Sequence, residues 1–143
     1  MAEQRRIPAV EGLFTWPSES PRLIGGRCNG CGTYFFPSFA LFHKPDCEGG
    51  PVEEVLLASR GKLVSYTVQY YPPPPPYVAP DPFPPMPIGT VELPEGLQIP
   101  GQITGCKIED LRTGIDVEIV IDDLFVDEEG NQLLTWKFRP LQP

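Results

Sequence analysis

The sequence is poor in histidine and contains no long apolar run. It has one histidine among 143 residues. A single histidine leaves little support for Ser-His-Asp or Cys-His catalytic sets. No run approaches the roughly 20 apolar residues that span a bilayer, and no apolar signal-peptide core follows residues 1–6. We therefore expect a cytoplasmic protein that contacts no membrane.

Basic residues are also scarce. The chain has 11 lysines and arginines against 19 acidic residues, for a net charge of −8. Between Glu92 and Glu129 the only basic residues are Lys107 and Arg112. Such a surface repels phosphate backbones, so we expect no nucleic-acid partner. Aromatic residues in segment 66–71 keep a single-strand-binding module open as an alternative.

Residue types that bind metals gather in residues 28–47. Their spacing is Cys-x2-Cys-x11-His-x3-Cys, formed by Cys28, Cys31, His43 and Cys47. Three thiolates and one imidazole make a closed tetrahedral set for a structural Zn²⁺. In a reducing compartment, clustered cysteines favour metal over a disulfide. A redox pair, or thiols without metal, are the alternatives.

Glycines flank the second cysteine of this cluster. Gly30 and Gly32 allow a tight turn that aims backbone N–H groups at sulfur, where positive φ favours glycine. Lys44 stands where a Cys-Pro-x-Cys knuckle would have cysteine, and a protonated lysine cannot ligate. The fourth ligand is therefore His43, one place earlier, or another group, and we assign it to His43. Apolar cover for the metal is expected from Phe39, Leu41 and Phe42.

The length of the chain allows a small module followed by one compact domain. A module of about thirty residues buries too little apolar surface to fold alone, so metal would have to stabilise it. We expect an N-terminal extension at residues 1–20, irregular in structure, a zinc ribbon at 21–50 and a barrel at 51–143 with a proline-rich loop at 72–87.

Alternating apolar residues predict an all-β barrel. The expected strands are 61–71, 88–93, 97–104, 115–121 and 133–138. In the first of these strands, Val64, Tyr66 and Val68 would form one apolar face. A short helical turn at 107–114, ended by Gly114, separates the third strand from the fourth. Five strands with a helix in that place are typical of an OB-fold. A five-stranded SH3-like barrel is the alternative.

The loop between the first two barrel strands holds ten prolines between Pro72 and Pro87. The run at residues 72–76 predicts a stiff polyproline II segment that projects from the barrel. Apolar residues on this loop and near the N-terminus are candidate partner contacts: Phe14, Trp16, Tyr77, Phe83 and Met86. The alternative is that they cover their own domain.

Two further features have plain interpretations. Cys106 has no activating base near it in the sequence. We therefore interpret it as a small residue at the end of a strand and not as a nucleophile. The acidic residues at 122–123 and 127–129 fit a solvated hairpin turn better than a site for a hard cation.

Several motifs occur together in this chain. They are Arg27-Cys28-Asn-Gly-Cys31-Gly32, Gly61-Lys-Leu-Val-Ser-Tyr-Thr67, residues 105–114 and Lys137-Phe138-Arg139-Pro140. This combination resembles the acyl-CoA-associated OB-fold/zinc-ribbon family, whose members are small partners of thiolase-fold enzymes. The resemblance covers residues 13–140 and implies a rubredoxin-like zinc ribbon before an OB-fold.

The resemblance also implies a role. The chain would be a non-catalytic accessory subunit that braces a thiolase-fold catalytic subunit and shapes its acyl-CoA site. The narrower resemblance is to the zinc-ribbon subunit of benzoylsuccinyl-CoA thiolase, in anaerobic toluene degradation; the partner of a steroid side-chain aldolase is the alternative. A free-standing acyl-CoA binder also stays open. The candidates for contact with coenzyme A are Arg27, Lys44, Lys62, Lys137 and Arg139, with ion pairing inside an acidic protein as the alternative.

Overall fold

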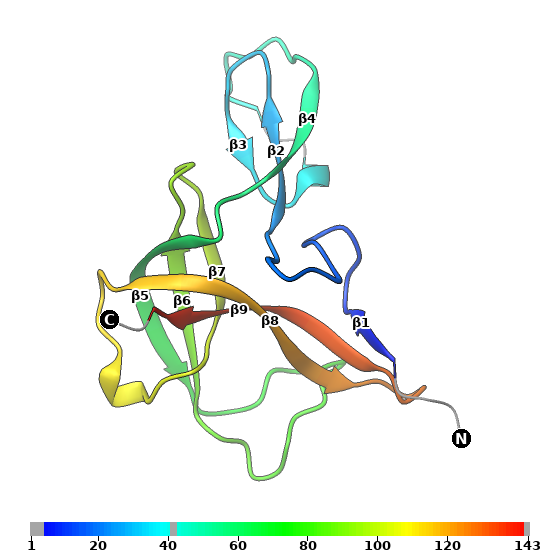
Figure 1. The fold of residues 1–143 in the computed structure, drawn as a ribbon, viewed down its shortest axis with the longest axis vertical. Coiled ribbons are helices and arrows are strands. Elements are labelled where there is room, and N and C mark those ends of the chain that lie inside the picture. Colours follow the sequence, from blue (N-terminus) through cyan, green and yellow to red (C-terminus); the bar gives the residue numbers. More distant parts are fainter. Residues whose placement is uncertain (1–4, 41–42, 142–143) are drawn as a thin grey trace.

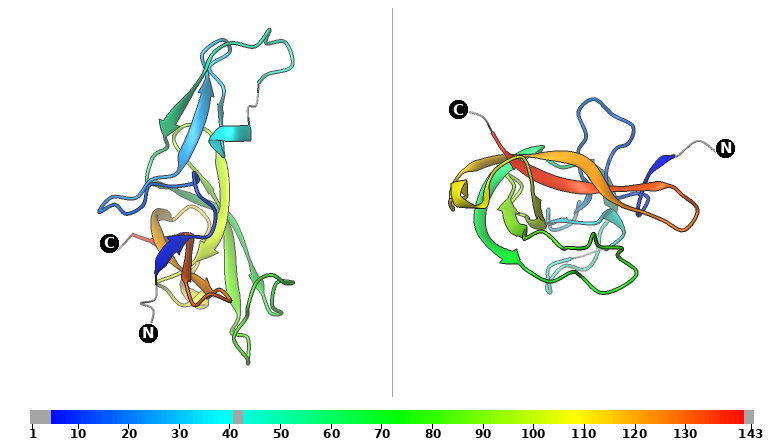
Figure 2. Two further views of the ribbon diagram at one scale, coloured as in Figure 1. Left: turned by 90° about the vertical axis from the view of Figure 1, so that its right-hand side faces the viewer. Right: turned by 90° about the horizontal axis from the view of Figure 1, so that it is seen from below.

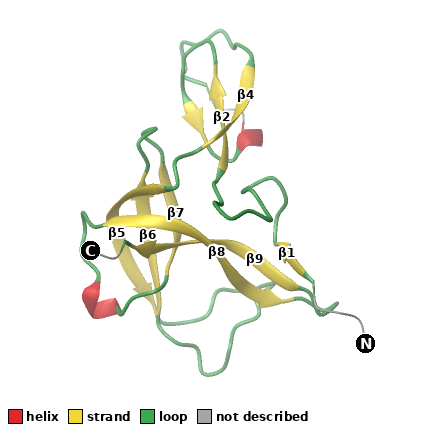
Figure 3. Cartoon of the chain, in the orientation of Figure 1, coloured by secondary structure: helices red, strands yellow, loops and turns green. Residues whose placement is uncertain are grey.

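The structure is a computed structural model that describes residues 5–40 and 43–141. It consists of β-strands and two short 3-10 turns (Figures 1 and 3). The elements are β1 (Arg6–Pro8), β2 (Ile24–Cys28), β3 (Tyr34–Phe35), η1 (Ser38–Ala40), β4 (Val52–Leu56), β5 (Arg60–Gln69), β6 (Met86–Glu92), β7 (Gln98–Ile103), η2 (Ile108–Asp110), β8 (Asp116–Val126) and β9 (Gln132–Pro140). Among the described residues, no helix has the length and apolar character needed to cross a membrane.

Five strands close into a barrel. The larger sheet has the order β1-β9-β7-β6-β5-β8, and β8 also pairs with β9. The β7–β9 pairing is parallel, while the other contacts between barrel strands are antiparallel. The turn η2 lies between β7 and β8, as the OB-fold prediction requires. The all-β class and the five-stranded barrel are therefore confirmed.

The barrel core is apolar. Its most buried side chains come from all five barrel strands and include Leu63, Val91, Ile103, Val117 and Phe138. Burial of each large side chain of this kind contributes about 1.5–3 kcal/mol to folding.

Strand β5 departs from its predicted pattern. The register between β5 and β6 shifts between Leu63 and Ser65. Leu63 is fully buried, whereas Val64 and Tyr66, predicted to form an apolar inner face, are exposed. A bulge of this kind inserts one residue into the pleat. After it, Tyr66 lies opposite Gly89 and its hydroxyl donates to the Leu111 carbonyl at 3.2 Å, although 38 % of the residue stays exposed.

The second sheet belongs to the metal module. It has the order β3-β2-β4 and stands at one end of the long axis of the molecule (Figures 1 and 2). Strand β4 pairs with β2 from Val52 to Leu56, beyond the boundary predicted at residue 50. Gly26 in β2 lies under the ring of Phe35, because a Cβ there would overlap that ring. A glycine is thus needed where the two strands approach.

The two sheets share one core. Leu23, which precedes β2, and Leu57, which follows β4, are buried together with the barrel residues. Their backbones are joined, since Leu57 N–H donates to the Leu23 carbonyl at 2.9 Å. The Arg22 guanidinium donates to the carbonyls of Leu56 and Leu57 at 2.9 and 2.7 Å. The ribbon is therefore fixed to the barrel at both of its chain ends.

The N-terminal segment is not irregular throughout, as the sequence had predicted. Strand β1 runs parallel to β9, with Ile7 opposite Leu133. Phe14 forms an isolated bridge with Leu23 and is only 5 % exposed. The prediction that Phe14 contacts a partner is wrong for this reason: its ring is part of the core.

The proline-rich loop bends back towards the barrel. It leaves β5, extends beneath the barrel and returns to β6 (Figures 1 and 2). A turn at Pro75 and Pro76 ends the proline run, so the stiff polyproline II segment predicted for residues 72–76 does not extend through these two residues. The ring of Tyr77 meets that of Phe125 on β8 edge-on, with centroids 5.6 Å apart.

Candidate functional site

Four metal-ligating side chains meet in the ribbon. One ligand atom from each of Cys28, Cys31, His43 and Cys47 lies within 4.8 Å of the other three. His43 Nδ1 is 3.0 Å from Cys28 Sγ, and the Sγ atoms of Cys28 and Cys47 are 3.8 Å apart. Two sulfurs on a tetrahedral Zn²⁺ would be about 3.8 Å apart, given Zn–S bonds of about 2.3 Å. The donor set fits a metal ion.

Backbone hydrogen bonds position these ligands. Gly32 N–H donates to the Cys28 carbonyl at 2.7 Å, and Cys47 N–H donates to that of Lys44 at 2.9 Å. Gly32 has a φ of +73°, as the turn prediction required. Gly50 is needed for a different reason: a Cβ there would lie 2.9 Å from the backbone nitrogen of Gly30, which is too close.

Nearby N–H groups stabilise thiolates in the cluster. The backbone N–H of Cys31, with those of Gly30 and Gly50, lowers the pKa of Cys28 to about 7. The Lys44 N–H, with Thr33, lowers the pKa of Cys31.

The third thiol has the opposite shift. The Gly49 N–H lies 3.4 Å from Cys47 Sγ and acts to lower its pKa. Burial and the neighbouring sulfurs of Cys28 and Cys31 outweigh this effect, so the pKa of Cys47 is raised. Because like charges accumulate, a third thiolate needs a cation among the sulfurs.

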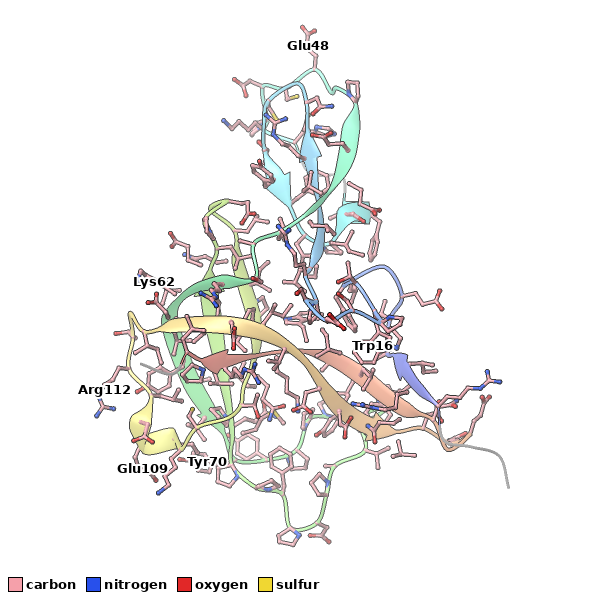
Figure 4. The ribbon with its side chains drawn as sticks, in the orientation of Figure 1. Trp16, Glu48, Lys62, Tyr70, Glu109 and Arg112 are labelled. Atoms are coloured by element: carbon pink, nitrogen blue, oxygen red, sulfur yellow. The ribbon has the colours of Figure 1, made fainter. Side chains whose placement is uncertain are left out.

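The surface around the cluster is open. Glu48 marks the tip of the ribbon (Figure 4). Phe39 was expected to cover the metal but is 62 % exposed. Leu41 and Phe42, expected in the same role, lie outside the described residues.

The candidates for coenzyme A contact mostly form ion pairs instead. Carboxylates lie 2.8–3.8 Å from the cationic nitrogens in the pairs Arg27–Glu53, Lys62–Asp116, Lys137–Asp122 and Arg139–Glu118. Lys137 is also only 9 % exposed, so its assignment as a surface contact is corrected. Within the described residues, Lys44 has no such ion pair. The cations are divided between ribbon and barrel and do not form one phosphate site.

The candidate partner contacts lie in two places. Trp16 is half-buried near the N-terminal segment, with the Arg6 guanidinium carbon 5.9 Å from its ring centroid (Figure 4). Tyr77, Phe83 and Met86 are half-buried on the proline-rich loop. At the start of this loop, Tyr70 and Tyr71 are 65 % and 76 % exposed.

An apolar groove was not predicted from the sequence. It has a volume of about 280 Å³ and lies between the proline-rich loop and the barrel. Its walls include Pro73, Tyr77, Met86, Ile88, Pro100 and Trp136. No motif marks the groove, because these residues come from distant segments. The apolar alternation of Leu134, Trp136 and Phe138 was the one available indication.

The acidic hairpin is closed by its own hydrogen bonds. The Asp127 carboxylate accepts hydrogen bonds from the backbone N–H groups of Glu129 and Asn131, at 3.0 and 2.8 Å. These bonds close the turn between β8 and β9, as the hairpin interpretation expects.

Comparisons with known proteins agree with this architecture. A sequence profile described as the ChsH2 C-terminal OB-fold domain matches residues 54–122. The chain is 38 % identical to a DUF35 domain-containing scaffold protein of Methanocaldococcus jannaschii, over 84 % of this chain and 82 % of that protein. It is 31 % identical to the benzoylsuccinyl-CoA thiolase subunit BbsA of Thauera aromatica, over 85 % of this chain and 78 % of that subunit.

A solved structure is similar as well. The chain superposes on a chain of the Ltp2-ChsH2(DUF35) aldolase with a TM-score of 0.63 and 28 % identity, covering 83 % of this chain and 84 % of that one. The resemblance noted from the cysteine and barrel motifs is thereby confirmed. The chain belongs to the DUF35 family of proteins with a ChsH2-type OB-fold domain.

Proposed function

We propose that this protein is a non-catalytic accessory subunit of a heteromeric thiolase-type enzyme that acts on an acyl-CoA with a bulky acyl group. The observation that carries the proposal is the place of His43, the only histidine of the chain, 3.0 Å from Cys28 Sγ inside the cluster. A histidine held there is not available as a general base.

The relatives support the same role. One is named as a subunit of a thiolase, another as a scaffold protein, and the solved structure pairs a DUF35 chain with an aldolase. The benzoylsuccinyl-CoA thiolase subunit supports the narrower proposal of a thiolase in anaerobic aromatic degradation. The aldolase supports the alternative of a steroid side-chain aldolase partner.

In this proposal the cluster holds a structural Zn²⁺. Cys28, Cys31, His43 and Cys47 would fill all four positions of a tetrahedral ion, which leaves none open for a substrate. Metal binding would supply folding free energy to the small ribbon sheet. The free cysteines need a reducing compartment, so we place the protein in the cytoplasm.

The docking face in this proposal is the proline-rich loop, with Tyr77, Phe83 and Met86. These side chains are half-buried, and aromatic and methionine side chains with few charges around them are typical of the centre of an interface. Trp16 is proposed as a second contact. Coenzyme A would lie at the border between the subunits, and Lys44 on the ribbon is the candidate that keeps a free ammonium group in the described part of the chain.

Co-expression with a candidate thiolase-fold protein from the same organism tests the proposal. We expect a stable complex in size-exclusion chromatography and acyltransferase or aldolase turnover only when both chains are present. Replacing residues 72–85, which end before β6, by a short Gly/Ser linker should weaken assembly while metal content and barrel melting stay unchanged. Full assembly and turnover with the shortened loop would rule out the loop as the docking face.

A further inference from the structure

The groove beneath the proline-rich loop is uncharged in a strongly acidic protein. None of its lining residues is charged. From Leu63 to Val91 the chain carries one charged side chain, Asp81, and β7 carries none, although the net charge of the chain is −8. A charged group placed in this groove would lose its hydration without gaining a counter-ion. The groove therefore fits a neutral group only.

The groove is also held in shape. Trp136 Nε1–H donates to the Pro100 carbonyl at 2.9 Å, which fixes one wall. The opposite wall includes Tyr77, whose ring packs edge-on against Phe125. Side chains that are already ordered lose little entropy when a partner binds.

Two polar side chains line the same groove. Gln102 and Thr135 take part in no side-chain hydrogen bond within the described residues. An occupant with an apolar body and one polar tip can fill the groove and bond to either side chain. Tyrosine and tryptophan have this form, and both are enriched at the energetic centres of interfaces.

The surroundings favour a protein over a small molecule. The groove, at about 280 Å³, is smaller than the range of roughly 300–1,000 Å³ typical of ligand pockets. It opens to solvent. Tyr70 and Tyr71, which precede the loop that forms one of its walls, are exposed, and Tyr70 lies at the foot of the barrel where β5 ends (Figure 4). A shallow pocket within a neutral aromatic surface is complementary to an uncharged patch on a partner.

We propose that the groove is an anchor pocket that receives one aromatic side chain, tyrosine or tryptophan, from an uncharged patch of the thiolase-fold subunit. This inference rests on the proposed function, because it takes that subunit as the partner.

The test is to fill the groove and measure subunit affinity. Thr135→Phe adds a ring inside the groove, and Thr113→Phe is the matched control on an exposed turn outside it. Isothermal titration with the thiolase-fold subunit should show a Kd raised ~10-fold or more for Thr135→Phe. The Kd for Thr113→Phe should stay close to that of the wild type.

Thr135 lies in β9, so a second variant outside this strand keeps the test independent of the stability of β9. Tyr77→Ala removes one wall from a loop, and it should also raise the Kd while the melting temperature and metal content stay near wild type. Wild-type affinity for both Thr135→Phe and Tyr77→Ala would overturn the anchor pocket.

The remaining outcomes are equally decisive. Unchanged assembly with a raised KM only for bulky acyl-CoA substrates would mean that an acyl group occupies the groove, and the proposal would be wrong. If the wild-type chain binds no thiolase-fold subunit, the proposed function fails and this inference fails with it. If the wild-type chain binds the thiolase-fold subunit and the groove variants bind it with the same Kd, this inference alone is overturned.

Discussion

The ring of Phe36, at the end of the ribbon, meets the ring of Trp136 on the last barrel strand edge-on, with centroids 5.5 Å apart. This contact joins the metal module to the barrel on the side that also carries the groove. Together with the Leu23–Leu57 contact, it makes the ribbon part of the barrel core.

We expect Phe36 and Trp136 to be coupled energetically. Aromatic pairs in this geometry contribute about 0.5–1.5 kcal/mol beyond the area they bury. A double-mutant cycle with Phe36→Leu and Trp136→Leu, followed by urea denaturation, should give a coupling energy in that range. Additive effects of the two changes would show that ribbon and barrel do not interact through these rings.

His43→Ala should lose the metal, whereas Cys106→Ser should keep one Zn²⁺ per chain. Cys106 lies outside the four-residue cluster, so its thiol has no part in the proposed ligand set. Elemental analysis of the purified variants measures the metal directly. Zinc retained by His43→Ala and lost by Cys106→Ser would reverse the assignment.

Zinc affinity should rise steadily with pH. A ligand must be deprotonated to bind, so protons compete for Cys28 below its pKa of about 7 and for Cys47 at still higher pH, because its pKa is raised. Competition with a chromophoric chelator between about pH 6 and 9 measures this dependence. A flat profile would mean that these thiols do not bind the ion.

Two lysines of the barrel should differ in their effect on stability. Lys137 is nearly buried beside Asp122 at 3.3 Å, whereas Lys62 is exposed beside Asp116 at 2.8 Å. Lys137→Met should cost ~1–3 kcal/mol because it leaves a half-buried carboxylate without its cation. Lys62→Met should cost about 0–1 kcal/mol. Equal losses in thermal denaturation would contradict the difference in burial.

Nucleic acids should not bind with useful affinity. Carboxylates outnumber basic residues in this chain, so phosphate is repelled and residual binding should disappear with salt. Fluorescence anisotropy with labelled single strands at about 0.15 M salt is the measurement. Sub-micromolar binding under these conditions would restore the single-strand-binding alternative.

The barrel strands were predictable because local rules determine them. Period-2 alternation and turn residues placed β5, β6, β7 and β9 within two residues of their observed limits, and the short turn η2 falls inside the predicted segment. Strand β8 continues to Val126, five residues beyond its predicted end. The four cluster residues were found from spacing alone. In both cases the sequence pattern and the three-dimensional requirement concern residues near one another in the chain.

Long-range packing was not predictable in the same way. Strand β1 depends on pairing with β9, more than 120 residues away, and three residues give no periodic pattern. The burial of Phe14 depends on Leu23 and on the barrel. Leu63 is buried in β5 while Val64 is exposed, next to a register shift that composition does not indicate. Lys137 is buried only because β8 brings Asp122 opposite β9.

The last strand sets a limit on how this protein can be divided. β9 pairs with β1, β7 and β8, so three neighbours depend on it, yet it lies outside the region matched by the family profile. A fragment cut at residues 54–122 would have neither β9 nor β1, and it would leave β7 and β8 with unpaired backbone edges. Such edges recruit other chains and lead to aggregation. The region matched by the family profile is therefore smaller than the unit that must be expressed and studied.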